Sequence, residues 1–269
     1  MTERDYAPSD NSLVRRLISA AIALPLLIFS IWVGTWWLAA IAALAVLLAL
    51  REFYRLAGAA GAGPYTPLGI VWGVGLIAAA AAGGTGWLWV LLFGALLTLI
   101  VGAVRRSSQT VAVDTLVTTF GALYVGGTLS AAVLIRQLDQ GLQWLLLAFL
   151  ITFATDTGAY AVGKPFGSRR MAPSISPGKT WEGAIGGVAA GIGATIALVA
   201  LLDLPLSAWS ALGLGAAAAV VSQFGDLMES KLKRLAGAKD SGGLIPGHGG
   251  LLDRLDSLVL VFPLVYYAS

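Results

Sequence analysis

Long runs of apolar residues without charge are the feature that most limits what this chain can fold into. The segment from Leu38 to Leu50 contains only Leu, Ala, Ile and Val, and similar runs recur along the 269 residues. A helix needs about 20 such residues to cross the roughly 30 Å of hydrocarbon in a bilayer. A membrane β-barrel would instead show segments of about 10 residues with alternating polarity. The sequence therefore predicts an all-α fold, a polytopic membrane helix bundle.

Nine runs are candidates for transmembrane helices. Only Gly34-Thr35 separates the first from the second, and the runs 36–50 and 255–268 are short, so the count is least constrained at both ends. The first run follows Arg15-Arg16, and its alternative is a cleavable signal peptide, although it is longer than a usual signal core. The nine predicted helices are 17–34, 36–50, 67–83, 86–104, 115–135, 143–163, 182–202, 206–228 and 255–268.

This count divides the chain into an N-terminal transmembrane half, 1–140, with about five helices, and a C-terminal half, 141–269. The C-terminal half holds the two longest connections, 164–181 and 229–254, which are rich in Gly, Pro, Lys and Arg. Binding and catalytic residues are more frequent on connections than inside the elements they join. We therefore expect function to concentrate in these two segments.

Basic residues fall almost entirely on one side of the predicted helices. Of the 17 Lys and Arg residues, all but Arg136 lie on the side of the N-terminus. Lys and Arg accumulate in cytoplasmic loops. The N-terminus and both long loops are therefore predicted to be cytoplasmic, with the C-terminus outside.

Composition excludes several classes of protein. Hydrophobic residues make up 58% and charged residues only 12% of the chain, which excludes a water-soluble globule. The chain has no cysteine and a single histidine, His248. Disulfides, cysteine-ligated zinc, a thiol nucleophile and multi-histidine metal sites are thus excluded. Any metal must be held by oxygen ligands.

Carboxylates in or next to apolar runs need an explanation, because a charge at bilayer depth costs roughly 2.5–3.5 kcal/mol on insertion scales. Asp156 shares one helical face with Thr152 and Tyr160, at four-residue spacing. One interpretation is a polar seam between helices. The other is a carboxylate that faces a watery cavity near the cytoplasmic surface.

Two further acidic clusters occur where predicted helices meet the cytoplasmic surface. Ser222, Asp226, Glu229 and Ser230 share one face of a helix, and Asp253 and Asp256 lie three residues apart at the start of the last predicted helix. The segment between them carries Lys231, Lys233, Arg234 and Lys239. Hard oxygen ligands beside positive charge suit a divalent cation bound together with a polyphosphate. The alternative is structural salt bridges among the same groups.

Two glycine-containing segments are candidates for phosphate binding. Residues 239–250 (KDSGGLIPGHGG) allow close approach of the backbone to an anion, although they match no standard phosphate-loop pattern. Lys179 and Thr180 lie at the expected start of a helix, a position that attracts phosphate, and the alternative is a capped helix with a snorkelling lysine. Gly183, Gly187 and Gly191 follow at four-residue spacing and predict a helix-packing ridge.

Together, these segments closely resemble the signature of the phosphatidate cytidylyltransferase (CDP-diacylglycerol synthase) family. The resemblance covers roughly residues 150–257, whereas residues 1–140 carry no comparable motif. The matching stretches are 156–160 (DTGAY), 176–183 (SPGKTWEG), 225–230 (GDLMES), 230–234 (SKLKR), 239–240 (KD), 246–250 (PGHGG) and 253–256 (DRLD).

The resemblance implies a reaction in which phosphatidic acid attacks the α-phosphorus of CTP, giving CDP-diacylglycerol and pyrophosphate, with Mg²⁺ required. The implied metal ligands are Asp226 and Asp253, with Asp256 and Glu229 in or next to the coordination sphere. The implied catalytic set is Asp226, Asp253, Asp256, Lys239 and His248, the last as a hydrogen-bond donor to phosphate. The implied substrate-binding set is Lys179, Thr180, Ser230, Lys233, Arg234, Gly249, Gly250, Arg254 and Asp156.

The substrates imply where such a site lies. CTP is water-soluble and the lipid stays in the leaflet, so we expect a polar cavity open to the cytoplasm, with a side opening between helices, in a bacterial inner membrane. No nucleic-acid partner is expected, and a homodimer is left open. The alternatives are a secondary transporter, with acidic residues near midplane around broken helices, and another CTP-using enzyme, such as a polyprenol kinase, which transfers the γ-phosphate.

Overall fold

The computed structural model describes residues 25–26, 28–105, 110–244 and 249–269, and these are mostly helical. Within those ranges, the only sheet is an antiparallel hairpin of β1 (Arg170–Ala172) and β2 (Ser176–Thr180). The longer helices are α2 (Thr35–Ala59), α3 (Thr66–Ala82), α4 (Gly86–Val104), α5 (Val111–Gly121), α7 (Gly141–Phe166), α8 (Trp181–Leu201) and α9 (Ala208–Leu235). The shorter ones are the π-helical η1 (Ala122–Gly127), α6 (Thr128–Arg136), α10 (Leu252–Leu255) and α11 (Val261–Ala268).

In the described part of the chain, six helices are long and apolar enough to cross a bilayer. They are α2, α4, the continuous helix made of α5, η1 and α6, α7, α8 and α9; α3 is apolar but shorter, at 17 residues. The prediction of a mostly helical chain is therefore confirmed, with six candidate membrane spans among the described residues. The count of nine and the side of the N-terminus are not confirmed, and half of the run 17–34 lies outside the described residues.

The segment 255–268 differs from the predicted span, because it is divided into the end of α10, a series of turns and α11. With eight residues, α11 is only about 12 Å long, well short of the hydrocarbon thickness. It buries Val261, Phe262 and Val265 and packs on α6, α7 and α9. This segment is a core helix, and the prediction of a span there is not confirmed.

Helix α9 extends past its predicted end at residue 228 to Leu235. Glu, Lys, Leu and Arg are good helix formers, so the fall in hydropathy after residue 228 does not end the helix. The predicted loop 229–254 is corrected accordingly, because Lys231, Lys233 and Arg234 lie on α9.

The predicted loop 164–181 is also more ordered than expected. Helix α7 continues to Phe166, and the β1–β2 hairpin fills most of the remainder. Glu182, in the first turn of α8, accepts a hydrogen bond from the Ser168 hydroxyl at 2.7 Å and one from the Arg169 N–H at 3.2 Å. The hairpin is thereby tied to the start of α8.

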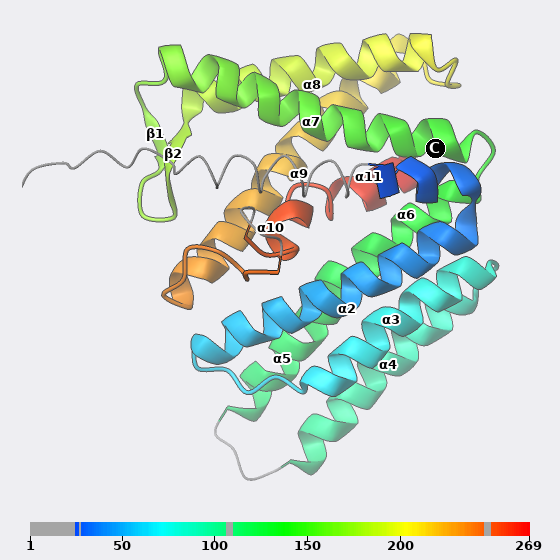
Figure 1. Cartoon of the computed structure of the whole chain (residues 1–269), viewed down its shortest axis with the longest axis vertical. Coiled ribbons are helices and arrows are strands. Elements are labelled where there is room, and N and C mark those ends of the chain that lie inside the picture. Colours follow the sequence, from blue (N-terminus) through cyan, green and yellow to red (C-terminus); the bar gives the residue numbers. More distant parts are fainter. Residues whose placement is uncertain (1–24, 27, 106–109, 245–248) are drawn as a thin grey trace, which may run out of the picture.

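The predicted glycine ridge packs α8 against α7, as Figure 1 shows for the two neighbouring ribbons. Gly183, Gly187 and Gly191 are buried. A Cβ at Gly183 would lie 2.8 Å from the carbonyl oxygen of Ala159, and one at Gly187 would lie 2.9 Å from that of Thr155. Side chains at these positions would force the helices apart, so the packing interpretation of this motif is confirmed.

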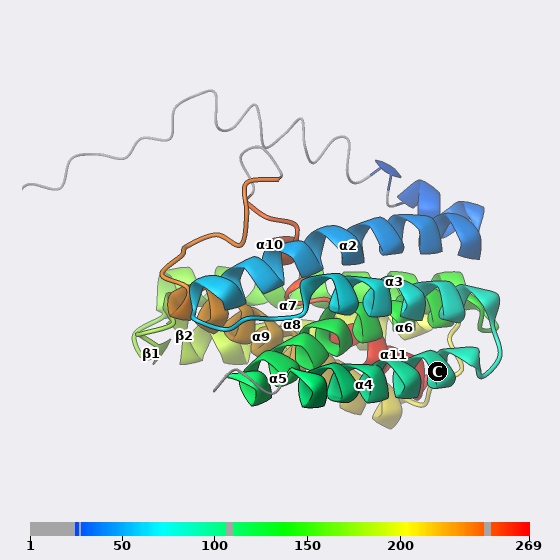
Figure 2. The ribbon, with the colours of Figure 1, turned by 90° about the horizontal axis from the view of Figure 1, so that it is seen from below.

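The two halves of the chain are in direct contact. Helix α11 joins them by packing on α6 as well as on α7 and α9, and α10 contacts both α2 and α9 (Figures 1 and 2). The Gly63 N–H donates to Asp114 at 2.6 Å, so the α2–α3 connection meets the start of α5. Segments predicted to share one membrane face thus lie together in space.

Candidate functional site

The C-terminal half of α9 supplies most of the polar residues of the site. Ser222, Asp226, Glu229 and Ser230 all lie on this helix, as the spacing predicted. Glu229 is 2% exposed, and Lys233 follows it by one turn. A buried carboxylate needs a partner, and Lys233 provides one.

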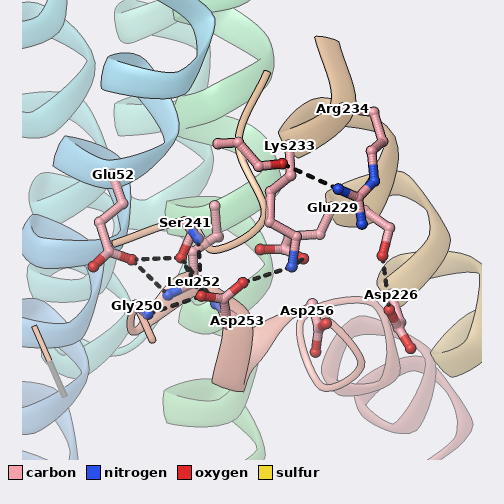
Figure 3. A network of polar contacts seen from close by, with 12 residues as sticks. Glu52, Asp226, Glu229, Lys233, Arg234, Ser241, Gly250, Leu252, Asp253 and Asp256 are labelled. Carbon is pink, nitrogen blue, oxygen red and sulfur yellow. Dashed lines mark hydrogen bonds and ion pairs between the residues drawn. The ribbon is translucent and has the colours of Figure 1, made fainter. Parts of the chain in front are cut away.

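Lys233 bridges two carboxylates from distant parts of the chain (Figure 3). Its Nζ lies 2.5 Å from Glu229 Oε2 and 2.6 Å from Asp253 Oδ1. The second Asp253 oxygen, Oδ2, accepts hydrogen bonds from the N–H groups of Ser241 and Gly250 at 2.9 and 2.8 Å. Burial raises the pKa of Asp253, but hydrogen bonding to Glu229, Lys233 and these two N–H groups outweighs it and holds that pKa well below its usual range.

Asp226 pairs with a different lysine. Lys179 Nζ lies 2.6 Å from Asp226 Oδ2, and the Ser230 hydroxyl donates to Asp226 Oδ1 at 3.3 Å. Lys179 lies on strand β2. Thr180, the last residue of that strand, caps α8 because its hydroxyl oxygen accepts a hydrogen bond from the Gly183 N–H at 3.1 Å. The alternative of a helix cap is confirmed for Thr180, whereas Lys179 forms an ion pair with α9 instead of snorkelling.

Asp256 interacts electrostatically with Asp226 and forms no ion pair within the described residues. Its backbone carbonyl packs directly on Gly225, at a point where a Cβ would collide with it. Asp256 follows α10 and lies outside the six candidate spans. Burial and the neighbouring charge of Asp226, with a smaller contribution from Asp156, raise its pKa to about 7. Its two acidic neighbours and its burial thus disfavour the ionised form of Asp256.

Gly225→Ala is expected to move Asp256, because the added methyl group meets backbone and no side chain can rotate away. Overpacking of this kind destabilises a protein by about 1–3 kcal/mol. We expect a lower melting temperature in detergent together with loss of activity. Gly213→Ala on the same helix is the control, since its Cβ meets open space. Equal behaviour of the two variants would contradict the close approach.

The acidic side chains of the site differ in how well they could hold a divalent cation. Among the described residues, no group of three or more His, Asp or Glu side chains is arranged to hold a metal ion. Asp226 and Asp253 were expected to share a metal, yet they pair with different lysines. Asp253 is already saturated by its donors, whereas Asp226 has a single lysine partner and interacts electrostatically with Asp256 and Asp156, whose carboxylate oxygens are hard ligands. The donor chemistry therefore fits a hard cation best on the Asp226 side.

Two hollows lie on different sides of α9. A polar cavity of about 570 Å³ is lined by Asp156, Arg170, Lys179 and Asp226, among others. A largely apolar cavity of about 430 Å³ is lined by residues of α2, α5, η1 and α9, including Phe53, Val117, Tyr124, Met228 and Glu229. Asp226 and Glu229, three residues apart, thus face different cavities.

The remaining predicted residues lie around this centre. The exposed Arg234 donates from Nε to the Ile175 carbonyl at 3.1 Å and so links α9 to the hairpin. Lys239 and Arg254 are exposed, and Gly249 has a φ of +82°, which favours glycine. His248 lies outside the described residues.

Sequence reasoning missed Glu52, Arg55 and Ser241. Glu52 is 8% exposed on α2, and the Ser241 hydroxyl donates to it at 3.0 Å. The sequence did contain a signal for Glu52, because it is a carboxylate directly after the apolar run 36–50. The predicted helix ended at residue 50, however, so Glu52 lay outside it and received no role.

These features define a protein with several candidate membrane spans and a charged site between a polar and an apolar cavity. The model of one family, the cytidylyltransferase family, matches residues 14–269, and the chain belongs to that family.

Its relatives include proteins named phosphatidate cytidylyltransferase. One from Staphylococcus aureus is 46% identical over 127 residues, which cover 47% of this chain and 49% of the relative. One from Brucella suis is 39% identical over 193 residues, which cover 67% of this chain and 71% of the relative, and one from Brucella abortus matches equally well. The match thus spans about half the length of the Staphylococcus relative.

Proposed function

We propose that this chain transfers CMP from CTP to phosphatidic acid and releases CDP-diacylglycerol and pyrophosphate. The observation that carries the proposal is the pair of lysine–carboxylate contacts, Lys179–Asp226 and Lys233–Asp253, between a polar and an apolar cavity. Membership of the cytidylyltransferase family and the names of the relatives support the same reaction.

The chemistry needs positioning and charge neutralisation more than covalent help. A phosphate oxygen of phosphatidic acid forms a bond to the α-phosphorus of CTP. The bond from that phosphorus to the oxygen bridging it to the β-phosphorus breaks, and pyrophosphate leaves with the electron pair. The attacking phosphate is already anionic near neutral pH, so the site needs cations and hydrogen-bond donors and no general base.

Lys179 and Lys233 are proposed to bind phosphate groups. Each already holds a carboxylate at 2.5–2.6 Å, so its ammonium group is placed where a phosphate oxygen can replace or join that carboxylate. The other proposed substrate contacts are Asp156, Thr180, Ser230, Arg234, Lys239, His248, Gly249, Gly250 and Arg254.

Mg²⁺ would be held by Asp226 and Asp256, with Asp156 nearby. Bound there, it would neutralise charge on the triphosphate. Asp253 and Glu229 can join it only if Lys233 moves to a phosphate, because that lysine occupies both carboxylates.

The two cavities match the two substrates. CTP suits the polar cavity, which is lined by Arg170 and Lys179. The acyl chains of the lipid suit the apolar one, where the buried Tyr124 hydroxyl has no hydrogen-bond partner within the described residues and can donate to a lipid oxygen. Tyr124 belongs to η1, and π-helical segments are frequent at functional sites. We place this centre at the cytoplasmic face of a bacterial inner membrane, and the scheme applies equally to a monomer and a homodimer.

Filling the apolar cavity is expected to weaken binding of phosphatidic acid without changing the binding of CTP. Val117→Trp should raise KM for phosphatidic acid by about tenfold, which corresponds to about 1.4 kcal/mol of lost lipid binding, and should leave KM for CTP unchanged. Leu96→Trp, at a position 55% exposed on α4, is the control. A rise in KM for CTP instead would place the nucleotide in this cavity.

A transporter is less well supported. The transporter hypothesis predicts broken helices around Asp156 and Asp226. These residues instead lie in α7 and α9, which are continuous helices of 26 and 28 residues.

The test uses purified protein, Mg²⁺, phosphatidic acid and CTP labelled at either the α- or the γ-phosphate. The proposal expects the α-label in the lipid and the γ-label in pyrophosphate. A γ-label in the lipid would identify a kinase, and no label in the lipid would reject both enzymes.

A further inference from the structure

Glu52 is a buried carboxylate far in sequence from the residues it touches. It lies near the end of α2 and accepts hydrogen bonds from the Ser241 hydroxyl at 3.0 Å and the Leu252 N–H at 2.9 Å (Figure 3). No ion pair to Glu52 occurs among residues in the described ranges. Its partners are therefore neutral donors, and its role depends on accepting hydrogen bonds.

These two partners lie on either side of the segment that carries Gly249 and Gly250. Leu252 begins α10, and Ser241 also binds Asp253, with its N–H and its hydroxyl each 2.9 Å from Asp253 Oδ2. The Glu52 carboxylate thus binds a residue on each side of this segment, Ser241 and Leu252. Asp253, which pairs with Lys233, directly follows Leu252.

Two further observations show how closely the connection fits against α2. Arg55, one turn after Glu52, donates to the Ser241 carbonyl at 2.5 Å. A Cβ added at Gly242 or at Gly250 would collide with the Glu52 side chain. The backbone at Gly242 and Gly250 therefore packs directly on the carboxylate.

We propose that Glu52 is a positioning residue, which holds the connection between α9 and α10 so that Asp253 meets Lys233. The N-terminal half of the chain would then set the geometry of a centre built from the C-terminal half. The activity readout of this inference rests on the proposed function, whereas its structural readout does not.

Glu52→Ala removes both hydrogen bonds. Residues that orient a ligand group typically change activity by about 10–100-fold when mutated, and we expect a fall in kcat of that size with little change in either KM. Glu52→Gln keeps an acceptor oxygen on a side chain of equal length and should retain most activity. Glu52→Asp is one methylene shorter and should behave like Glu52→Ala.

Amide hydrogen exchange gives the structural readout. Peptides covering residues 238–244 and 249–256 should exchange faster in Glu52→Ala than in wild type, and at the wild-type rate in Glu52→Gln. Arg51→Ala is the matched control, because Arg51 is exposed and adjacent on the same helix. If Glu52→Ala fails to fold, Arg55→Ala, which removes the contact with the Ser241 carbonyl, should show the same faster exchange.

The inference is overturned if Glu52→Ala exchanges like wild type, or if Glu52→Gln loses as much activity as Glu52→Ala. A wild-type protein that makes no CDP-lipid would reject the proposed function, and the exchange result would still decide the role of Glu52.

Discussion

Replacing Asp226 by asparagine is expected to lower the rate of CDP-lipid formation by about 10²–10³-fold, the scale seen when one electrostatic group is removed from a transition-state site. The variant loses the charge that holds Lys179 at 2.6 Å and one of the carboxylates proposed to hold Mg²⁺. The rate is measured at saturating CTP and phosphatidic acid.

Asp203→Asn is the control for this variant. Asp203 is exposed in a turn with a φ of +52°, a conformation that asparagine also tolerates, so the change removes a charge far from α9's polar half. Equal rates in the two variants would contradict the role of Asp226.

Lys233→Met is expected to produce the largest loss of stability. The lysine lies between Glu229 and Asp253, and methionine leaves both carboxylates buried without a cation. Breaking a buried ion pair by removing one partner destabilises a protein by about 3–5 kcal/mol. The measurement is the midpoint of thermal unfolding in detergent, followed by activity at a temperature where the variant is folded.

Lys231→Met tests whether this effect is specific. Lys231 is exposed on the same helix, so its replacement should leave the midpoint nearly unchanged. A Lys233→Met protein as stable as Lys231→Met would show that the bridge contributes nothing to stability.

Local features of the fold could be predicted from the sequence. The predicted helix 86–104 coincides with α4, and the run 182–202 differs from α8 by one residue at each end. The cap at Thr180 and the ridge of glycines on α8 also follow from local rules of capping and packing. These features depend on neighbours along the chain, which the sequence shows directly.

The C-terminal segments were harder to predict, because polarity and helix propensity disagree there. Residues 229–235 are polar but favour helix, and α9 continues through them. Residues 255–268 are apolar but fold as a short buried helix, because α6, α7 and α9 cover it. Hydropathy alone does not separate burial in protein from burial in lipid.

The composition of the site could be predicted, but its pairings could not. Spacing predicted Asp226 and Glu229 on one helix face, but in the structure Asp226 forms an ion pair with Lys179 and Glu229 forms one with Lys233. The contacts of Lys233 are among the ion pairs that the sequence left as an alternative, whereas the Lys179–Asp226 pair is not. The role of Glu52 depends on residues about 190 to 200 positions away, and no local pattern reports such a contact.

The most direct test of the central claim is to locate Mn²⁺, in place of Mg²⁺, by anomalous scattering from crystals grown with CTP. We expect Mn²⁺ between Asp226 and Asp256, with the triphosphate in the polar cavity beside Lys179. Mn²⁺ and CTP bound away from the polar half of α9 would contradict it.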